Sequence, residues 1–243
     1  MFIISRKRIS LILICFLIGI SVYSYQGIKT GTQERVEETI EEATATPVSG
    51  KVVVLDAGHG TPDEGAQSSK GTTEAETNLK IALKVQNLLE QSGCTVILTR
   101  SDEKAIYDLD KTTLKEKKIS DIRNRVKIGN SASADIFVSI HLNKIPQQQY
   151  WGWQCFYSSK SEESMKLAKI LQSSLNDAIQ KDNKRVAMKL DTVYIMKHVE
   201  IPISIVECGF LSNPEEEQQL LDDEYQDKLA WGIYNGIIEY FTK

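Results

Sequence analysis

Three histidines occur in the chain, and two of them follow apolar runs of the kind that form β-strands. His59 comes after the run at 52–58, and His141 directly follows the run at 136–140. Continuous β-branched runs are typical of strands buried on both faces, and ligand sites of open α/β sheets gather at the carboxyl ends of such strands. Two scarce imidazoles at two strand ends therefore predict a metal site.

A carboxylate would complete this site, because hydrolytic zinc centres use three protein ligands, and two His with one Glu is a standard set. Glu74 begins a predicted helix, where the helix dipole favours an acidic side chain. The preceding loop at 58–71 is glycine-rich and long enough to fold back over a metal. Glu76 competes for the same role, since a slip in the assignment would exchange the two carboxylates.

Hydrolysis at a metal also needs a group that takes a proton from water and returns it to the leaving amine. Glu207 ends the apolar run at 203–206. A carboxylate at the end of a buried strand costs free energy unless it is paired, ligated or catalytic. We therefore interpret Glu207 as the base, and a salt bridge with Arg100 or Arg125 is the alternative.

Other side chains that could do chemistry have weaker patterns. Cys208 could be a nucleophile beside His141, but nothing in the sequence marks a third, orienting residue. His198 lies in a polar stretch and is interpreted as a surface histidine. Trp151 and Trp153 alternate on an expected edge strand, where they either stack on sugar or pack in the core or its rim.

The elements that must position these residues alternate between strands and helices. Strands are expected at 52–55, 95–99, 137–142, 153–157 and 203–207. Helices are expected at 74–91, 105–130, 162–181, 215–222 and 226–241. This order predicts an α/β fold, a single domain with a mainly parallel or mixed twisted sheet and helices on both faces.

The first 50 residues are expected to lie outside this domain. A basic cluster at 6–8 precedes an apolar run, so we interpret residues 1–25 as a signal peptide or an uncleaved signal anchor. Residues 26–50 are polar and acidic, which predicts a flexible linker. The catalytic domain at 51–243 would then lie outside the cytoplasmic membrane, either secreted or tethered to it.

Charge and cysteine content exclude some classes of protein. The formal net charge is −4, and no basic stripe with interleaved aromatics is present, which argues against a nucleic-acid partner. The lysines at 115, 117 and 118 are interpreted as a solvated helix face. The cysteines at 94, 155 and 208 do not have the spacing of a disulfide framework, so we interpret them as small buried apolar residues.

Several ordered motifs together resemble the zinc-dependent N-acetylmuramoyl-L-alanine amidases of the Amidase_3 type. They are LDAGHG at 55–60, DEGA at 63–66, VILTR at 96–100, DIFVSIHLN at 135–143 and VECGFLSNP at 206–214. The resemblance extends over essentially all of residues 51–243.

The resemblance implies one zinc ion held by His59, Glu74 and His141, and thereby selects Glu74 over Glu76. It implies that Glu207 is the catalytic glutamate. The implied reaction is hydrolysis of the amide bond between N-acetylmuramic acid and the L-alanine of the peptidoglycan stem peptide.

The chain departs from the family pattern in three places. Thr61 stands where the family usually has Gly, and the segments at 125–130 and 183–185 are altered. We hypothesise that Asn143 and Arg185 bind substrate by contacting peptide carboxylate or amide groups.

Within the family, the single domain behind a hydrophobic segment most resembles the sporulation-specific amidases of endospore formers. These remove stem peptides in the spore cortex, so that muramic lactam can form and later be recognised in germination. A vegetative cell-wall autolysin, a zinc deacetylase of peptidoglycan sugars and a non-catalytic wall-binding relative are the alternatives.

Regulation is expected to come from outside the domain. The stretch between Asn143 and Glu162 is too short for the inhibitory helix of some division amidases. Control would then come from expression, from localisation at the forespore envelope or cortex, or from an activating partner protein.

Overall fold

The computed structural model describes residues 48–131 and 133–243. The predicted signal segment at 1–25 and the linker as far as residue 47 lie outside the described residues. Val48 is buried, and the amide of Gly50 donates a hydrogen bond to the carbonyl of Gly93. Among the described residues, no helix combines the length and the apolar character needed to cross a membrane.

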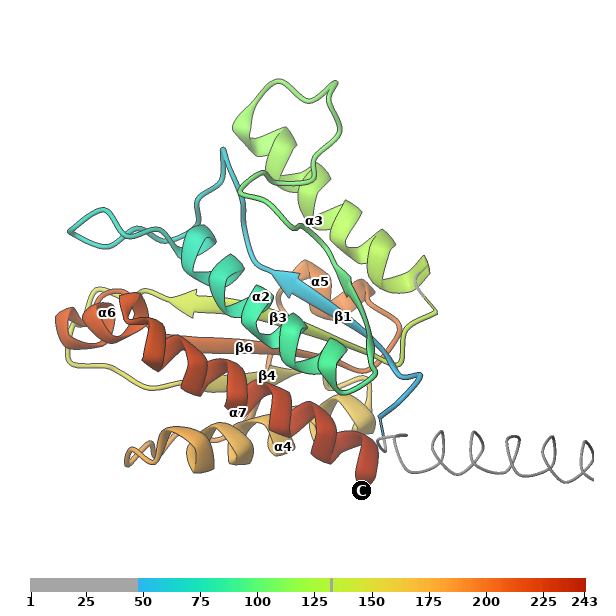
Figure 1. Ribbon diagram of the computed structural model, residues 1–243. Coiled ribbons are helices and arrows are strands. Elements are labelled where there is room, and N and C mark those ends of the chain that lie inside the picture. Colours follow the sequence, from blue (N-terminus) through green and yellow to red (C-terminus); the bar gives the residue numbers. More distant parts are fainter. Residues whose placement is uncertain (1–47, 132) are drawn as a thin grey trace, which may run out of the picture. The chain divides into compact units, whose positions relative to one another are not determined.

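A six-stranded sheet in the order β2-β1-β3-β6-β4-β5 forms the centre of the domain (Figure 1). The strands are β1 (Val52–Ala57), β2 (Thr95–Leu98), β3 (Ile136–Asn143), β4 (Gln154–Tyr157), β5 (Met188–Lys189) and β6 (Ile203–Phe210). Strands β2, β1, β3 and β6 run parallel to one another, whereas β4 pairs antiparallel with β6 and parallel with β5. The expected α/β fold with a mixed sheet is confirmed.

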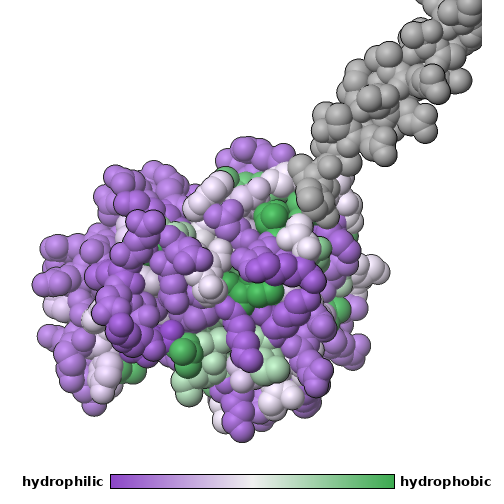
Figure 2. All heavy atoms as spheres, turned by 90° about the horizontal axis from the view of Figure 1, so that it is seen from below, coloured by the Kyte–Doolittle hydropathy of each residue, from purple (hydrophilic) through white to green (hydrophobic). Residues whose placement is uncertain are grey.

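Helices cover both faces of this sheet. They are α2 (Glu74–Gln91), α3 (Leu114–Ser131), α4 (Glu162–Ile179), α5 (Tyr194–His198), α6 (Pro214–Leu221) and α7 (Asp223–Thr242). Helices α2, α4 and α7 pack on one face, and α3 and α5 pack on the other (Figure 1). The surface seen from below is mostly hydrophilic, with small hydrophobic areas between the polar side chains (Figure 2).

The central strands are apolar throughout because both faces are covered. In β1, Val53 and Leu55 join the cluster under α2, α4 and α7, whereas Val54 joins the cluster under α3 and α5. Strand β3 alternates in the same way, with Val138 on the first face and Phe137 on the second. Since side chains alternate along a strand, a strand with two covered faces has no polar side.

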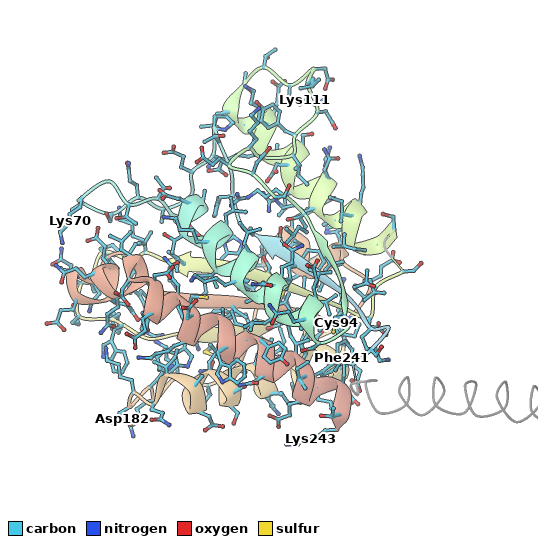
Figure 3. The ribbon with its side chains drawn as sticks, in the orientation of Figure 1. Lys70, Cys94, Lys111, Asp182, Phe241 and Lys243 are labelled. Atoms are coloured by element: carbon cyan, nitrogen blue, oxygen red, sulfur yellow. The ribbon has the colours of Figure 1, made fainter. Side chains whose placement is uncertain are left out.

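Helix α3 begins nine residues later than the expected helix at 105–130, and that prediction is wrong for residues 105–113. The side chain of Thr113 accepts a hydrogen bond from the Glu116 amide (3.2 Å), and the Glu116 carboxylate accepts one from the Thr113 amide (2.9 Å). This reciprocal capping box starts the helix at its observed residue. The loop before it includes Lys111, seen in the upper part of Figure 3.

Strand β4 is not the edge strand that was expected, because β5 pairs with it. The sequence also gave no indication of β5 or of the short helix α5. Trp153 is fully buried, and its Nε1–H donates to Oδ1 of Asn176 (2.8 Å), so it packs in the core and does not stack on sugar. The cysteines that the structure describes are free and buried, as expected.

Candidate active site

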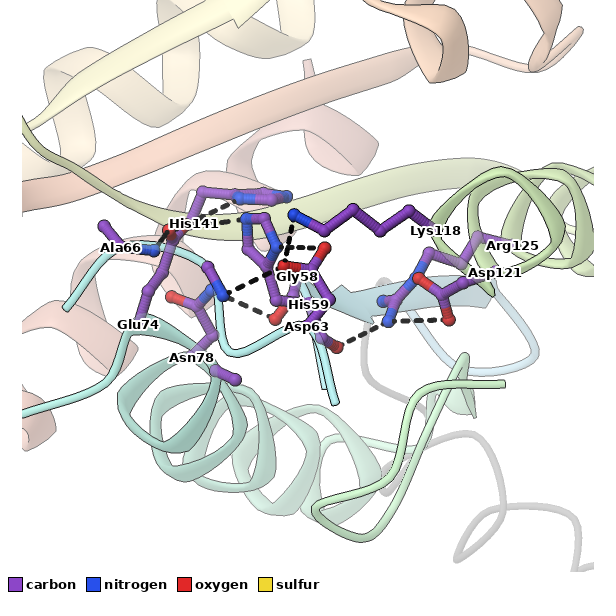
Figure 4. Close-up of polar contacts among 12 residues, drawn as sticks. Gly58, His59, Asp63, Ala66, Glu74, Asn78, Lys118, Asp121, Arg125 and His141 are labelled. Atoms are coloured by element: carbon purple, nitrogen blue, oxygen red, sulfur yellow. Dashed lines mark hydrogen bonds and ion pairs between the residues drawn. The ribbon is translucent and has the colours of Figure 1, made fainter. Parts of the chain in front are cut away.

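Three parallel neighbours, β1, β3 and β6, end at the same edge of the sheet. His141 in β3 is directly opposite Glu207 in β6, and His59 follows β1 by two residues. His59, Glu74 and His141 each offer a ligand atom, and these atoms lie within 4.8 Å of one another (Figure 4). The structure therefore brings together the residues that the sequence proposed as metal ligands.

Glu74 is buried at the start of α2, and both of its oxygens are occupied. Oε1 lies 2.9 Å from Nδ1 of His141 and accepts a hydrogen bond from the Leu142 amide (3.1 Å). Oε2 lies 3.4 Å from Nε2 of His59 and accepts one from the Ala66 amide (2.8 Å). These contacts hold the carboxylate between the two imidazoles.

The competing carboxylate of Glu76 is exposed. It forms an ion pair with Lys80 one turn along α2, at 2.7 Å. The geometry therefore supports Glu74 as the third member of the cluster.

Two glycines allow the side chains of this cluster to approach the backbone. A Cβ atom at Gly58 would overlap the ring of His141. A Cβ atom at Gly65 would lie 2.6 Å from Oε2 of Glu74, and the φ of Gly65 is +70°, a conformation that favours glycine.

The turn after β1 is held by donors from other elements. The carbonyl of Gly58 accepts hydrogen bonds from Nη2 of Arg100 (3.0 Å) and Nδ2 of Asn78 (3.2 Å). Arg125 donates to the His59 carbonyl and forms an ion pair with Asp56 at 2.6 Å. Both arginines are thus used by this turn, and the alternative that one of them pairs with Glu207 is wrong.

Opposite charges within the cluster stabilise one another. Burial disfavours a charged imidazole at His59, but hydrogen bonds with Asp63 and Glu74 outweigh it and raise the pKa of His59 to about 9. Burial likewise disfavours the Glu74 carboxylate, yet the two histidines hold the pKa of Glu74 well below its usual range. The site is therefore suited to a cation between these groups.

Glu207 faces a cavity of about 310 Å³ that also exposes His59 and His141. Its Oε2 atom is buried and has no hydrogen-bond partner among the described residues. Burial raises the pKa of Glu207 to about 7, with the nearby Glu74 adding to the shift and the histidines opposing it. The carboxylate can therefore gain or lose a proton near neutral pH.

The rest of the cavity lining contains both charged and apolar residues. The charged residues are Asp56, Asp63, Lys118, Asp121 and Arg125. The apolar residues are Ile122, Leu190, Val193, Ile195 and Ile205.

The two residues proposed to bind substrate, Asn143 and Arg185, are not part of the lining of this cavity. Asn143 ends β3, and its carbonyl accepts a hydrogen bond from the Leu211 amide. Arg185 donates to the Trp151 carbonyl (3.0 Å) and to Oε1 of Gln154 (3.1 Å).

Two earlier alternatives are excluded by position. Cys208 is fully buried, and burial raises the pKa of its thiol well above the usual value, so it is not a nucleophile. His198 is exposed, stacks on Tyr194 and contacts the Tyr194 carbonyl through Nδ1 (2.8 Å), in agreement with a surface histidine.

Sequence reasoning missed two charged residues at the site. Asp63 was noted only as part of a motif, and its Oδ2 lies 3.2 Å from Nδ1 of His59. Lys118 was assigned to a solvated helix face, but its amine lies 2.8 Å from Oδ1 of Asp63 and lines the cavity. The DEGA motif at 63–66 was the available signal for Asp63; Lys118 had none.

Comparison with known proteins agrees with this geometry. The germination-specific N-acetylmuramoyl-L-alanine amidase of Bacillus subtilis is 40% identical over 197 residues, which cover 81% of this chain and 82% of that protein. The CwlD amidase from Clostridioides difficile, solved in complex with the GerS lipoprotein, is 41% identical with a TM-score of 0.77. That match covers 79% of this chain and 98% of the solved chain.

A second solved structure, an N-acetylmuramoyl-L-alanine amidase from Clostridium difficile, has a TM-score of 0.70 at 29% identity, covering 80% of this chain and 98% of that one. Residues 53–239 match the Amidase_3 family, described as N-acetylmuramoyl-L-alanine amidase. The expected enzyme class is thus confirmed, and the chain belongs to the N-acetylmuramoyl-L-alanine amidase family.

Proposed function

We propose that this chain uses one zinc ion to hydrolyse the amide bond between N-acetylmuramic acid and L-alanine of the peptidoglycan stem peptide. The observation that carries the proposal is the buried carboxylate of Glu207, which has an unpartnered oxygen among the described residues and lines the same cavity as His59 and His141. These two histidines form the possible metal cluster with Glu74. Family membership supports peptidoglycan as the substrate.

The cluster fits zinc by its chemistry. Two imidazoles and one carboxylate are a standard set for hydrolytic zinc and leave a position for water or substrate. The ligand atoms already lie within 4.8 Å of one another, and Gly58 and Gly65 leave the space that the side chains need. When bound, zinc would supply a Lewis acid that polarises the scissile carbonyl and activates water.

Glu207 would carry the proton in this reaction. Its carboxylate would accept a proton from the attacking water and then donate it to the amine of the departing L-alanine. A pKa of about 7, raised by burial, suits a group that must do both near neutral pH.

The apolar residues of the cavity suit the groups next to the scissile bond. Val193, Ile195 and Ile205 line the same cavity as Glu207. The lactyl group and L-alanine each carry a methyl group that such a surface can cover, and covering it excludes water from the reacting atoms.

The test is digestion of peptidoglycan by the full-length protein, with a chelator, without it, and after zinc is returned. Mass spectrometry of the products should show free stem peptides, absent with chelator and restored by zinc. Glycan strands that lose acetyl groups while keeping their peptides would identify a deacetylase instead. If the peptidoglycan stays unchanged under all of these conditions, even with an activating partner protein added, the chain is a wall-binding protein.

We further propose that the substrate is the spore cortex, where loss of the stem peptide allows muramic lactam to form. Similarity to a germination-specific amidase and to CwlD supports this role. Deletion of the gene should leave cortex without muramic lactam and spores that fail to complete germination. A vegetative autolysin would instead show a defect in growing cells.

CwlD was solved in complex with the GerS lipoprotein, and on this basis we propose that this chain binds a lipoprotein partner and that the partner activates it. This chain itself would act outside the cytoplasmic membrane, either secreted or tethered by its residues 1–25. Activity of the isolated protein should rise when a lipoprotein co-purified from sporulating cells is added. Full activity of the isolated protein would contradict the need for a partner.

Arg185 and Asn143 remain proposed substrate contacts. Support comes from Gln154, which accepts a hydrogen bond from Arg185 and is the strand partner of Glu207. Arg185→Ala and Asn143→Ala should each raise KM for muropeptides more than they lower kcat. Unchanged kinetics in a variant would remove that residue from the substrate site.

A further inference from the structure

We propose that Asp63 and Lys118 are positioning residues for His59. In this assignment the Asp63 carboxylate holds Nδ1 of the imidazole, so that Nε2 is directed at the metal, and Lys118 holds the carboxylate. The inference rests on the proposed function, since it assigns His59 to a zinc site.

The contacts of the two ring nitrogens carry the argument. Nδ1 of His59 lies 3.2 Å from Oδ2 of Asp63, while Nε2 lies 3.4 Å from Oε2 of Glu74 (Figure 4). An ionised carboxylate can only accept a hydrogen bond, so Nδ1 must carry the hydrogen in this contact. A metal held by Nε2 and Glu74 would take the place of the hydrogen on Nε2, and a carboxylate on the other nitrogen is the usual support of such a ligand.

The backbone of His59 is held by other groups, so the contact with Asp63 serves to orient the imidazole ring. Arg125 donates to the His59 carbonyl, and the neighbouring Gly58 carbonyl accepts hydrogen bonds from Asn78 of α2 and from Arg100, which follows β2. The φ of His59 is 61°, an uncommon conformation for a residue with a side chain. Main-chain contacts thus determine where the residue lies, and the carboxylates determine how its ring is turned.

Asp63 is itself preorganised. Its amide and carbonyl form a reciprocal pair of hydrogen bonds with Gly60, at 2.8 and 2.9 Å. Its Oδ1 accepts a hydrogen bond from the Gly65 amide at 3.3 Å. The carboxylate therefore reaches His59 from a closed turn of its own chain.

Lys118 approaches Asp63 from α3, across the cavity (Figure 4). Its Nζ lies 2.8 Å from Oδ1, the carboxylate oxygen that does not contact the imidazole. A lysine ammonium can only donate hydrogen bonds, so Oδ1 is the acceptor in this contact. The lysine therefore keeps the carboxylate an acceptor while half of its own side chain stays exposed.

Zinc affinity of the metal-free full-length protein, measured by competition with a chromophoric chelator, tests the proposal without any turnover. Asp63→Ala should weaken zinc binding by about 10- to 100-fold, the range seen when such supports are removed. Asp63→Asn keeps the shape of the side chain, so its zinc affinity should fall less than that of Asp63→Ala. Lys118→Met should weaken binding several-fold, and Lys115→Met, an exposed lysine of the same helix, should have no effect.

A spectroscopic readout separates positioning from a general loss of structure. With only three histidines, nitrogen-15 labelling of the imidazoles in a His198→Gln background leaves two ring systems to assign. In the zinc-loaded wild type, the Nδ1–H of His59 should exchange slowly with solvent, and Asp63→Asn should accelerate this exchange.

The outcomes distinguish the two proposals. A wild type that binds no zinc would refute the proposed function. A wild type that binds zinc while Asp63→Ala and Asp63→Asn bind equally well would overturn only the positioning role. If Asp63→Ala does not fold, the zinc affinity of Asp63→Asn alone tests the positioning role. If Lys118→Met and Lys115→Met bind zinc with the same affinity, Lys118 has no part in positioning His59.

Discussion

At the scale of single residues, Glu207 combines two properties that a structural carboxylate does not usually share. Its oxygen is buried, yet no partner among the described residues satisfies it. A buried polar atom without a partner costs free energy, and such atoms are retained where chemistry needs them. By contrast, Glu74 accepts hydrogen bonds on both oxygens, as suits a group that must stay in one place.

Glu207→Gln should reduce kcat for muropeptide hydrolysis by about 100- to 10,000-fold, the usual contribution of a general acid and base. The amide keeps the shape, so zinc affinity should not change. Product release measured by mass spectrometry, together with zinc titration of the same preparation, checks both parts. Activity within a few-fold of wild type would remove Glu207 from the proton-transfer step.

Gly58→Ala should displace His141, because the added Cβ would overlap its ring. The φ of Gly58 is not positive, so the alanine costs little in backbone conformation. We expect zinc affinity to fall at least about 10-fold, as when the support of a ligand is lost. Titration with zinc measures the change, and an unaltered affinity would mean that the ring can move aside freely.

At the scale of elements, helix α3 has a second function besides covering the sheet. Lys118, Asp121 and Arg125 are spaced three and four residues apart, which places them on one face of the helix. That face meets Asp63, the turn after β1 and the cavity. The start of α3 therefore matters for the site as well as for the helix.

Thr113→Ala removes the capping hydrogen bond at the start of α3. The free energy of unfolding should fall by about 1 kcal/mol, which is typical for a lost N-cap. Lys115→Ala, in the same turn, is the matched control and should have little effect. Urea unfolding measures the stability of both variants. If Thr113→Ala is as stable as Lys115→Ala, Thr113 does not cap the helix.

Asp56 links β1 to α3 and to the neighbouring strands. Its carboxylate accepts hydrogen bonds from Arg125 (2.6 Å), Thr99 (2.7 Å) and Ser139 (2.6 Å). Burial opposes the charge, but Arg125 and the other partners lower the pKa of Asp56 from 3.8 to about 2. A carboxylate with a lowered pKa stabilises the fold above its unfolded pKa and loses that contribution as the pH falls through the folded pKa.

The contribution of Asp56 should be about 2 kcal/mol above pH 4, lost between about pH 4 and pH 2. Asp56→Asn should destabilise the fold at neutral pH by about 3 kcal/mol, because it leaves Arg125 with one acidic partner fewer. It should also flatten the stability profile between those pH values. Urea unfolding over this range tests both, and a variant profile as steep as that of wild type would contradict the assignment.

At the scale of the whole molecule, the sheet assembles a site from distant parts of the chain. Because β1, β3 and β6 are parallel neighbours, His59, His141 and Glu207 meet at one edge. Helix α2 adds Glu74 from the loop that returns to this edge. A metal that binds only this assembled site would stabilise the folded state by mass action.

Removal of zinc by a chelator should therefore lower the melting temperature by about 5–10 °C. Zinc at 100 times its Kd contributes about 2.7 kcal/mol, and each kcal/mol shifts the melting temperature of a domain of this size by about 2–4 °C. Glu74→Gln, which impairs the site, should melt at the same temperature with and without chelator. If the chelator lowers the melting temperature of Glu74→Gln as much as that of the wild type, the chelator acts at a place other than this site.

The sequence by itself determined the α/β class, the central strands and the residues His59, His141 and Glu207. These follow from local patterns, because continuous apolar runs form strands with two covered faces and ligands gather where such strands end. The start of α3 was also encoded locally, by Thr113 and Glu116, although the helical period at 105–130 concealed it.

Only the tertiary structure decided which charged groups meet. Arg125 could have paired with Glu207, and the fold pairs it with Asp56 instead. Lys118 had no local signal at all, since it lies in α3 and its partner Asp63 lies in the loop after β1. A charged side chain can pair with many others in a flexible chain, and the choice among them depends on how β1 and α3 pack together.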